Sequence, residues 1–223
     1  RDTDRSRGLG DVYKRQLMAE RVSVMAGLLT GIRYPAEEYQ KAWKSVLFNQ
    51  FHDILAGTSL RESYEDAAED YGYALHAAGR GLNSAVQSLS WQINIPMEEG
   101  MKPLVVVNPN AFNTKAEVQA ESWTLKEGTV LLDENGNQIP CQLVQSSAAL
   151  QGRCRICFVA DLPSLGWRTY RFAVREKAET FPEVAVSECS AENRWFKLTL
   201  DPETGYIASL LKKNDGTEYF SGP

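Results

Sequence analysis

The sequence lacks any long apolar run and any excess of positive charge. Its longest apolar pieces are as short as Leu104–Val107, far below the roughly 20 residues that a membrane-spanning helix needs. We therefore expect a soluble chain with no membrane partner. The 24 Lys and Arg residues are outnumbered by 29 Asp and Glu residues, which gives a net charge of -5. A nucleic-acid partner is not expected, because binding to a phosphate backbone requires a basic surface.

Cysteine is also scarce, with four residues at Cys141, Cys154, Cys157 and Cys189. They are too few and too dispersed for a disulfide framework, and no secretory leader precedes them. Reduced thiols are therefore expected. The expected location is the cytoplasm, and the expected source is a bacterium. Cys154 and Cys157 have the spacing of a zinc or redox pair, but no second pair follows. Residues three apart in a strand point to opposite faces, so we assign this pair no such role.

Residues 1–16 (RDTDRSRGLGDVYKRQ) are charged and nearly devoid of aliphatic side chains. They resemble a translated cloning or adapter sequence, and we expect a disordered, non-native leader in which nothing packs. The sequence also stops at Pro223 just after a strand-like segment. Both ends are therefore interpreted as cut.

From Leu17 onward, apolar residues recur three or four positions apart, which predicts a helix with one buried stripe. Gly31 and Pro35 are expected to end it. A second helix is predicted from Pro35 to about Leu47, because proline and the acidic residues that follow suit a first turn.

Ser59 and Glu62 have the spacing of a capping box, which predicts the start of a third helix that continues to about Leu89. Facing stripes on three helices predict a three-helix bundle over residues 17–99. Residues 100–223 instead contain β-branched or alternating segments separated by glycine turns, which predicts an antiparallel β-sandwich-type domain. The expected fold class is α+β.

Residues 49–59 (NQFHDILAGTS) place His52, one of only two histidines, beside Asp53 where the helical pattern breaks at Gly57. A neutral imidazole can bind zinc through one ring nitrogen. The other interpretation is a buried, hydrogen-bonded histidine at a helix end. A carboxylate and a tight turn beside the imidazole favour a binding site.

Residues 49–59 closely resemble the central-domain signature of the alpha-mannosidases of glycoside hydrolase family 38. Residues 161–170 (DLPSLGWRTY) resemble the family's turn before a strand. Residues 192–201 and 204–210 resemble the start of its large C-terminal β-sandwich. The three matches follow the family's order and span Leu17–Phe220, which is more specific than any one motif.

The resemblance implies a piece of a retaining, metal-dependent alpha-mannosidase that removes terminal alpha-mannosyl residues from glycans or oligosaccharides. The family's motif histidine binds a catalytic metal, usually zinc, and the aspartate after it contacts the substrate, so His52 is expected to bind zinc and Asp53 the sugar. Ala56 stands where relatives often carry proline, which leaves both residues unchanged.

In the family, the two carboxylic acids that retaining hydrolysis needs and the other metal ligands lie in an N-terminal α/β domain that is missing here. We therefore assign no catalytic residue within this chain and expect it to be inactive alone. Its expected partners are that domain and the C-terminal β-sandwich of the parent.

The alternative is a non-catalytic carbohydrate-binding or scaffolding module, in which His52 only satisfies a helix end. His76 is interpreted as structural or solvated, and the acidic run in residues 65–70 as a solvated helix face. Trp123 and Trp167 could stack on sugars, but core positions are expected for both.

Overall fold

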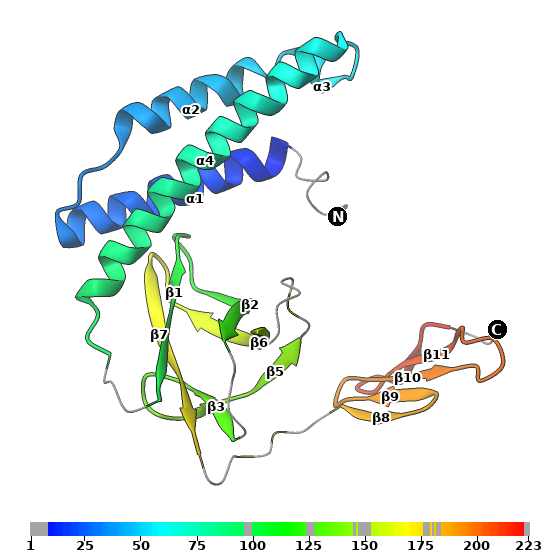
Figure 1. The fold of residues 1–223 in the computed structure, drawn as a ribbon. Helices are drawn as coiled ribbons and strands as arrows, with labels where there is room; N and C mark the ends of the chain where they lie inside the picture. Colours follow the sequence, from blue (N-terminus) through cyan, green and yellow to red (C-terminus); the bar gives the residue numbers. More distant parts are fainter. Residues whose placement is uncertain are drawn as a thin grey trace. The chain divides into compact units, whose positions relative to one another are not determined.

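A computed structural model describes residues 9–95, 100–123, 128–144, 146, 153–175, 179, 181 and 184–220 (Figure 1). The chain forms two compact units, Arg1–Lys177 and Ala178–Pro223. The predicted division after residue 99 marks the change from helices to strands inside the first unit. As a domain boundary it stays a prediction.

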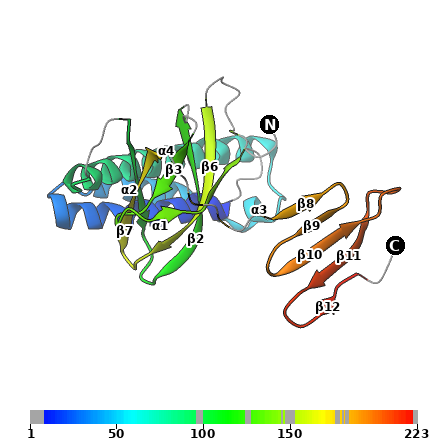
Figure 2. The ribbon, with the colours of Figure 1, turned by 90° about the horizontal axis from the view of Figure 1, so that it is seen from below.

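Among the described residues, the first unit begins with four helices: α1 (Leu9–Thr30), α2 (Ala36–Phe48), α3 (His52–Leu55) and α4 (Arg61–Gln92). The long helices α1, α2 and α4 lie side by side, as Figures 1 and 2 show, and α3 is a single turn between α2 and α4. The three-helix bundle is thus confirmed. None of these helices combines the length and apolarity that crossing a membrane would need.

The helices are joined by small buried residues along a common seam. α1 packs parallel to α4, since Thr30 near the end of α1 bonds Ser88 near the end of α4 at 2.6 Å. α2 runs antiparallel to α4, and its Ala42 is fully buried together with Ala74 of α4. Alanine at these positions lets the helix backbones approach closely. The close approach increases the number of van der Waals contacts between the helices, and these contacts stabilise the bundle.

The start of α1 differs from the expectation. α1 begins at Leu9, and Val12 and Gln16 are 2% and 0% exposed. Gln16 Nε2 donates a hydrogen bond of 2.9 Å to the Tyr39 carbonyl of α2. The expectation that nothing before Leu17 packs is therefore wrong for residues 9–16, because Val12, Gln16 and Ala19 recur at helical spacing on one face. Residues 1–8 lie outside the described part of the chain.

A β-sandwich follows the helices in the first unit. One antiparallel sheet has the order β1 (Lys102–Asn108), β7 (Gly166–Val174), β3 (Thr129–Leu132), β4 (Gln138–Ile139), and the other β2 (Thr114–Trp123), β6 (Arg153–Leu162), β5 (Cys141–Val144). Leu131 and Phe172 from the first sheet share one core with Ile156 and Phe158 from the second. The predicted α+β fold with an antiparallel sandwich is confirmed.

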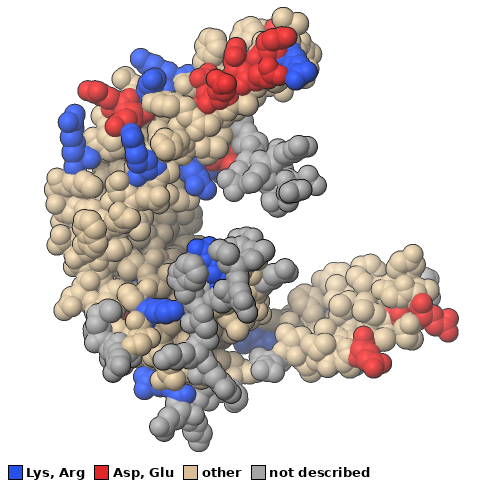
Figure 3. Space-filling model, in the orientation of Figure 1, with Lys and Arg blue, Asp and Glu red and all other residues tan. Residues whose placement is uncertain are grey.

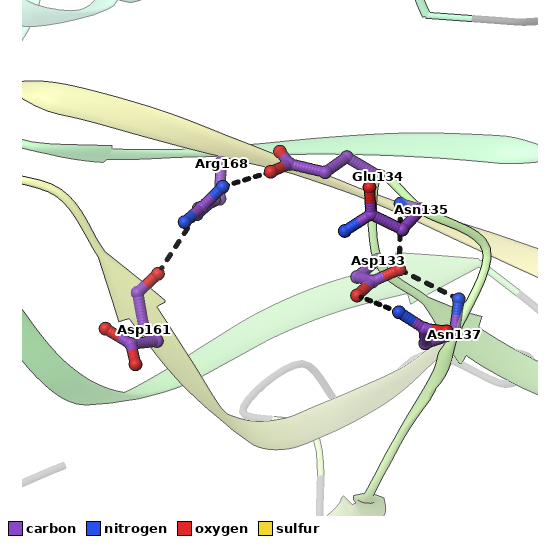
Figure 4. A network of polar contacts seen from close by, with 6 residues as sticks. All are labelled: Asp133, Glu134, Asn135, Asn137, Asp161 and Arg168. Carbon is purple, nitrogen blue, oxygen red and sulfur yellow. Dashed lines mark hydrogen bonds and ion pairs between the residues drawn. The ribbon is translucent and has the colours of Figure 1, made fainter.

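Side-chain hydrogen bonds fix the turn between β3 and β4 (Figure 4). Asp133 Oδ1 accepts hydrogen bonds from the backbone amides of Asn135 and Asn137 at 2.9 and 2.8 Å. Burial acts to raise the pKa of Asp133, but these bonds and the one from the Asn137 side chain outweigh it and hold the pKa below its usual value. Glu134 in the same turn pairs with Arg168 of β7, which ties the turn to the neighbouring strand.

The second unit contains a single described sheet. Its order is β12 (Thr217–Glu218), β11 (Ile207–Lys212), β10 (Phe196–Leu200), β9 (Ser190–Glu192), β8 (Ala185–Ser187), and every neighbouring pair is antiparallel. None of the described residues of this unit is buried. The sheet therefore lacks a packed second layer within the described residues.

Candidate functional site

His52 and Asp53 lie on the one-turn helix α3. Phe51 before it is extended, with φ -56° and ψ 139°, so the chain breaks from α2 before α3 begins. Gly57 closes the turn at φ +79°, a left-handed conformation that costs an L-residue roughly 1–2 kcal/mol. The Thr58 amide then donates a hydrogen bond of 3.0 Å to the Asp53 carbonyl. The glycine predicted to break the helical pattern therefore closes the turn that holds the His-Asp pair.

Both side chains of the pair are accessible to solvent. The His52 side chain is 80% exposed and the Asp53 side chain 50%, and His52 Nε2 lies 3.5 Å from Asp53 Oδ1. The Phe51 ring lies against the imidazole, with ring centroids 4.2 Å apart. The interpretation of His52 as a buried histidine at a helix end is therefore wrong for this structure.

A buried asparagine anchors the start of the motif to α4. Asn49 is 2% exposed, and its Nδ2 donates to the Ser45 carbonyl at 2.9 Å and to Asp70 Oδ2 at 2.8 Å. Its carbonyl accepts a hydrogen bond of 3.0 Å from the Tyr71 hydroxyl. Burial, with Asp70 nearby, raises the pKa of Tyr71 and keeps this hydroxyl a donor. These bonds fix the corner from which α3 projects.

The Tyr64 hydroxyl holds the other end of the motif. It donates to the Asp53 carbonyl at 3.2 Å and accepts from the Ser59 amide at 3.1 Å. α4 begins at Arg61, with Leu60 as its N-cap and no hydrogen bond from a capping side chain. The predicted capping box of Ser59 and Glu62 is therefore wrong, because the amide of Ser59 is bonded to the Tyr64 hydroxyl instead.

Replacing Tyr64 by phenylalanine is expected to lower the free energy of unfolding by about 1–2 kcal/mol, because both bonds to the turn are lost. The same change at Tyr73 is a matched control, since the Tyr73 hydroxyl makes no hydrogen bond to any described residue. Urea unfolding of the two variants measures the difference. Equal stabilities would show that the Tyr64 hydroxyl does not hold the turn.

The donors at this corner suit part of a zinc site. An exposed imidazole beside a carboxylate offers nitrogen and oxygen ligands of the kinds that zinc binds. Within the described residues, no group of three or more His, Cys, Asp or Glu side chains could hold a metal. Catalytic zinc usually takes three protein ligands. His52 therefore fits a zinc site only if further ligands come from outside the described residues.

The second histidine and the acidic run behave largely as predicted. His76 is exposed on α4. Glu65, Asp66 and Glu69 are exposed at the start of α4, where Figure 3 shows acidic side chains gathered together. Asp70 is the exception in the run, since it is half-buried and accepts the hydrogen bond from Asn49. The sequence pattern gave no sign of that structural role.

Within the described part of the chain, the remaining candidates are not grouped into a second metal site. Cys154 and Cys157 are both in β6, where the buried Ile156 shows which face is inward and places Cys157 on the other face. The four cysteines, all within the described residues, form no disulfide. Trp167 is half-buried in β7, and the side chain of Trp123 lies outside the described part of the structure.

The family model of the alpha mannosidase middle domain matches residues 11–89. Over these residues the chain is similar to the alpha-mannosidase middle domain. The predicted relationship to glycoside hydrolase family 38 is thereby confirmed, and His52 and Asp53 lie inside the matched middle domain.

Two solved structures from Enterococcus faecalis have the fold of the middle domain and of the strands that follow it. An alpha-mannosidase from strain V583 is 17% identical, with a TM-score of 0.67 over 92% of this chain and 27% of that chain. A protein in glycosyl hydrolase family 38 is 18% identical, with a TM-score of 0.67 over 92% of this chain and 28% of that chain. The chain thus spans little more than a quarter of either relative. None of the curated proteins compared with it matches.

Proposed function

We propose that the chain is part of a retaining, metal-dependent alpha-mannosidase that hydrolyses terminal alpha-D-mannosyl residues of glycans or oligosaccharides. The observation that carries this proposal is the accessible His-Asp pair of the middle domain, whose imidazole is 80% exposed. A histidine that binds a metal together with ligands from another domain must lie at the surface of the domain that carries it. The likeness to an alpha-mannosidase from Enterococcus faecalis supports the same class of reaction.

His52 would contribute one ligand to zinc, and Asp53 would bind the sugar. Zinc, when bound, supplies a Lewis acid that grips sugar hydroxyls. Asp53 Oδ1 accepts a weak bond of 3.3 Å from the Thr58 hydroxyl, whereas Oδ2 makes no hydrogen bond to a described residue. Oδ2 is thus available to accept a hydrogen bond from a mannose hydroxyl. That hydrogen bond would accelerate hydrolysis if it is stronger in the oxocarbenium-like transition state than in the bound substrate.

The remaining ligands and both catalytic carboxylic acids would come from an N-terminal α/β domain of the parent, so this chain alone would be inactive. The surface around α3 suits such a contact, because large apolar side chains that are more than half exposed surround the His-Asp pair in sequence. We call them the apolar collar: Leu47, Phe48, Phe51, Leu55 and Leu60. Apolar side chains this exposed are available to pack against another domain, and their burial there would be favourable.

The other proposed features of the parent are a C-terminal β-sandwich and a location in a bacterial cytoplasm. Both solved relatives named above come from a bacterium. The four cysteines form no disulfide, which is typical of a reducing compartment.

The test is to produce the parent enzyme with His52→Ala and, as a matched control, with His76→Ala. We expect His52→Ala to lose zinc and to lower hydrolysis of an aryl alpha-mannoside by at least about 100-fold, since even an indirect partner of a metal ligand commonly contributes 10–100-fold. His76 is exposed on α4, so His76→Ala should retain both. Unchanged zinc content and hydrolysis in His52→Ala would refute the assignment.

The rival function is a carbohydrate-binding or scaffolding module that needs no metal. Calorimetric titration of this chain with mannose, in the presence of a chelator, separates the two proposals. We expect no heat of binding, because Asp53 alone offers too few contacts to hold a sugar. Saturable binding without metal would favour the rival.

A further inference from the structure

The turn between β3 and β4 contains the one Asn-Gly step of the whole sequence, at Asn135 and Gly136. We call residues 133–137 the Asp133 turn (Figure 4). Asn135 is exposed there, and Gly136 takes the left-handed φ of +85°. Asparagine is chemically least durable before glycine, because glycine has no Cβ to shield its amide nitrogen and its backbone rotates freely. The side-chain amide and the nitrogen that can attack it are therefore neighbours in an accessible turn.

The reaction of these two groups is deamidation, which needs only water and a solvent base. The Gly136 nitrogen gives its proton to the base and attacks Asn135 Cγ. A bond from this nitrogen to Cγ forms as the bond from Cγ to Nδ2 breaks, and ammonia leaves. Water then opens the resulting succinimide. Opening at Cγ leaves aspartate, whereas opening at the main-chain carbonyl leaves isoaspartate, so that overall one water is consumed and one ammonia is released.

Two comparable steps elsewhere in the chain are less favourably placed. Asn83 precedes Ser84 inside α4, where the helical backbone engages the amide nitrogen in its own hydrogen bonds. Asp215 precedes Gly216 in an exposed turn, but hydrogen bonds, first of all from the Lys212 side chain, lower the pKa of Asp215 to about 2. An ionised carboxylate resists attack because it has no ready leaving group. The Asp133 turn is thus the most reactive of the three.

Hydrogen bonds to Asp133 control when this turn can react. Its Oδ1 accepts from the amides of Asn135 and Asn137 at 2.9 and 2.8 Å. The Gly136 amide donates to the Asp133 carbonyl at 3.1 Å. While these bonds hold, the attacking nitrogen is engaged elsewhere. Attack on Asn135 Cγ therefore requires an opened turn, and each bond to the carboxylate makes opening rarer.

We propose that Asn135 is a site of spontaneous deamidation whose rate is set by opening of the Asp133 turn. Aspartate at this position adds a third carboxylate beside Asp133 and Glu134, and like charges repel. Isoaspartate lengthens the main chain by one carbon and displaces the amides that Asp133 binds. Either product weakens the turn, and with it the tie from Glu134 to Arg168 of β7. The proposal does not depend on the mannosidase function.

Ageing of the whole 223-residue chain at pH 8, followed by proteolysis and tandem mass spectrometry, tests the proposal. We expect Asn135 to change from amide to acid, with isoaspartate among the products, faster than any other asparagine. Asp133→Ala should accelerate this conversion at least about 10-fold, because it removes hydrogen bonds to a charged acceptor. Glu134→Ala is the matched control. It removes the same charge from the same turn but none of the bonds to Asp133, and it should leave the rate nearly unchanged.

Each other outcome contradicts the proposal. An Asn135 that stays intact in the folded chain does so outright, and a folded chain that reacts as fast as the urea-unfolded chain shows that the turn does not set the rate. Equal rates in Asp133→Ala and Glu134→Ala would show the same. Should circular dichroism show that Asp133→Ala unfolds the sandwich, Asp133→Asn keeps an acceptor oxygen and should give an intermediate rate. None of these results bears on zinc binding by the parent.

Discussion

Replacing Gly81 by alanine is expected to lower the free energy of unfolding of the first unit by about 3 kcal/mol, the upper part of the range for overpacked cores. A Cβ at this position of α4 would lie 2.0 Å from Tyr39 Oη and 2.7 Å from its Cζ. Tyr39 cannot move aside easily, because it is 2% exposed and its hydroxyl shares a hydrogen bond of 2.8 Å with Ser23. Either the ring must shift or α4 must separate from α2.

The matched control is Gly72→Ala in the same helix. Gly72 is exposed, and an added Cβ there would have no neighbour within 4 Å. Alanine should therefore stabilise the helix by about 0.5–1 kcal/mol through propensity alone. Thermal unfolding followed by circular dichroism should show the Gly81 variant melting roughly 6–12 °C lower and the Gly72 variant slightly higher. Equal, small increases in both variants would show that Tyr39 does not occupy the space beside Gly81.

The presence of the three long helices could be predicted from the sequence. The residues on the buried face of α1 could be predicted only in part. The spacing of three or four residues from Leu17 onward includes Val22 and Met25, which are buried. It also includes Leu17, Met18, Leu28 and Leu29, which are 38, 41, 82 and 58% exposed. The buried positions include Ala19 and Ala26 at 0%. Periodicity weights large apolar residues, whereas close helix packing selects small ones, so the pattern alone could not identify the face.

The part of the candidate site that could be predicted from the sequence is the pair of His52 and Asp53, because histidine is rare in this chain and both residues lie in one short segment. Histidine beside aspartate at a break in a helix pointed to the corner that the structure places at the surface. The supports were not predictable, since Tyr64 and Asp70 reach the motif through tertiary hydrogen bonds from α4. A tyrosine and an aspartate on a helix have no local signature that distinguishes such contacts from solvent exposure.

Replacing Asn108 by aspartate is expected to destabilise the sandwich by about 3–5 kcal/mol at neutral pH, the usual cost of an uncompensated buried charge. Asn108 is 1% exposed at the end of β1. Its Nδ2 donates to the carbonyls of Phe112 and Pro163, both at 2.9 Å, and its Oδ1 accepts from the Asn110 amide at 3.0 Å. Aspartate keeps the shape and the acceptor but turns a charged oxygen toward two carbonyl oxygens.

Asn113→Asp is the matched control, since it makes the same substitution in the same loop. Asn113 is exposed, and its Oδ1 accepts a hydrogen bond of 2.9 Å from the Ser164 amide. Its Nδ2 donates to no described residue, so aspartate preserves the contact that exists. We expect a change within about 0.5 kcal/mol, as for ordinary surface substitutions.

The pH dependence separates loss of the buried amide from a general disturbance of the loop. The carboxyl introduced at position 108 lacks a cation and faces two acceptors, so folding raises its pKa above the unfolded value of about 4. Its charge penalty is then fully present above the folded pKa and disappears below the unfolded one. Urea unfolding at pH 7 and pH 4 should therefore show the deficit relative to the unsubstituted protein shrinking in acid, because the protonated carboxyl can again donate to one carbonyl. A deficit that is equal at both pH values would mean that the lost stability arises from a displaced loop and not from a charge held in place of the Asn108 amide.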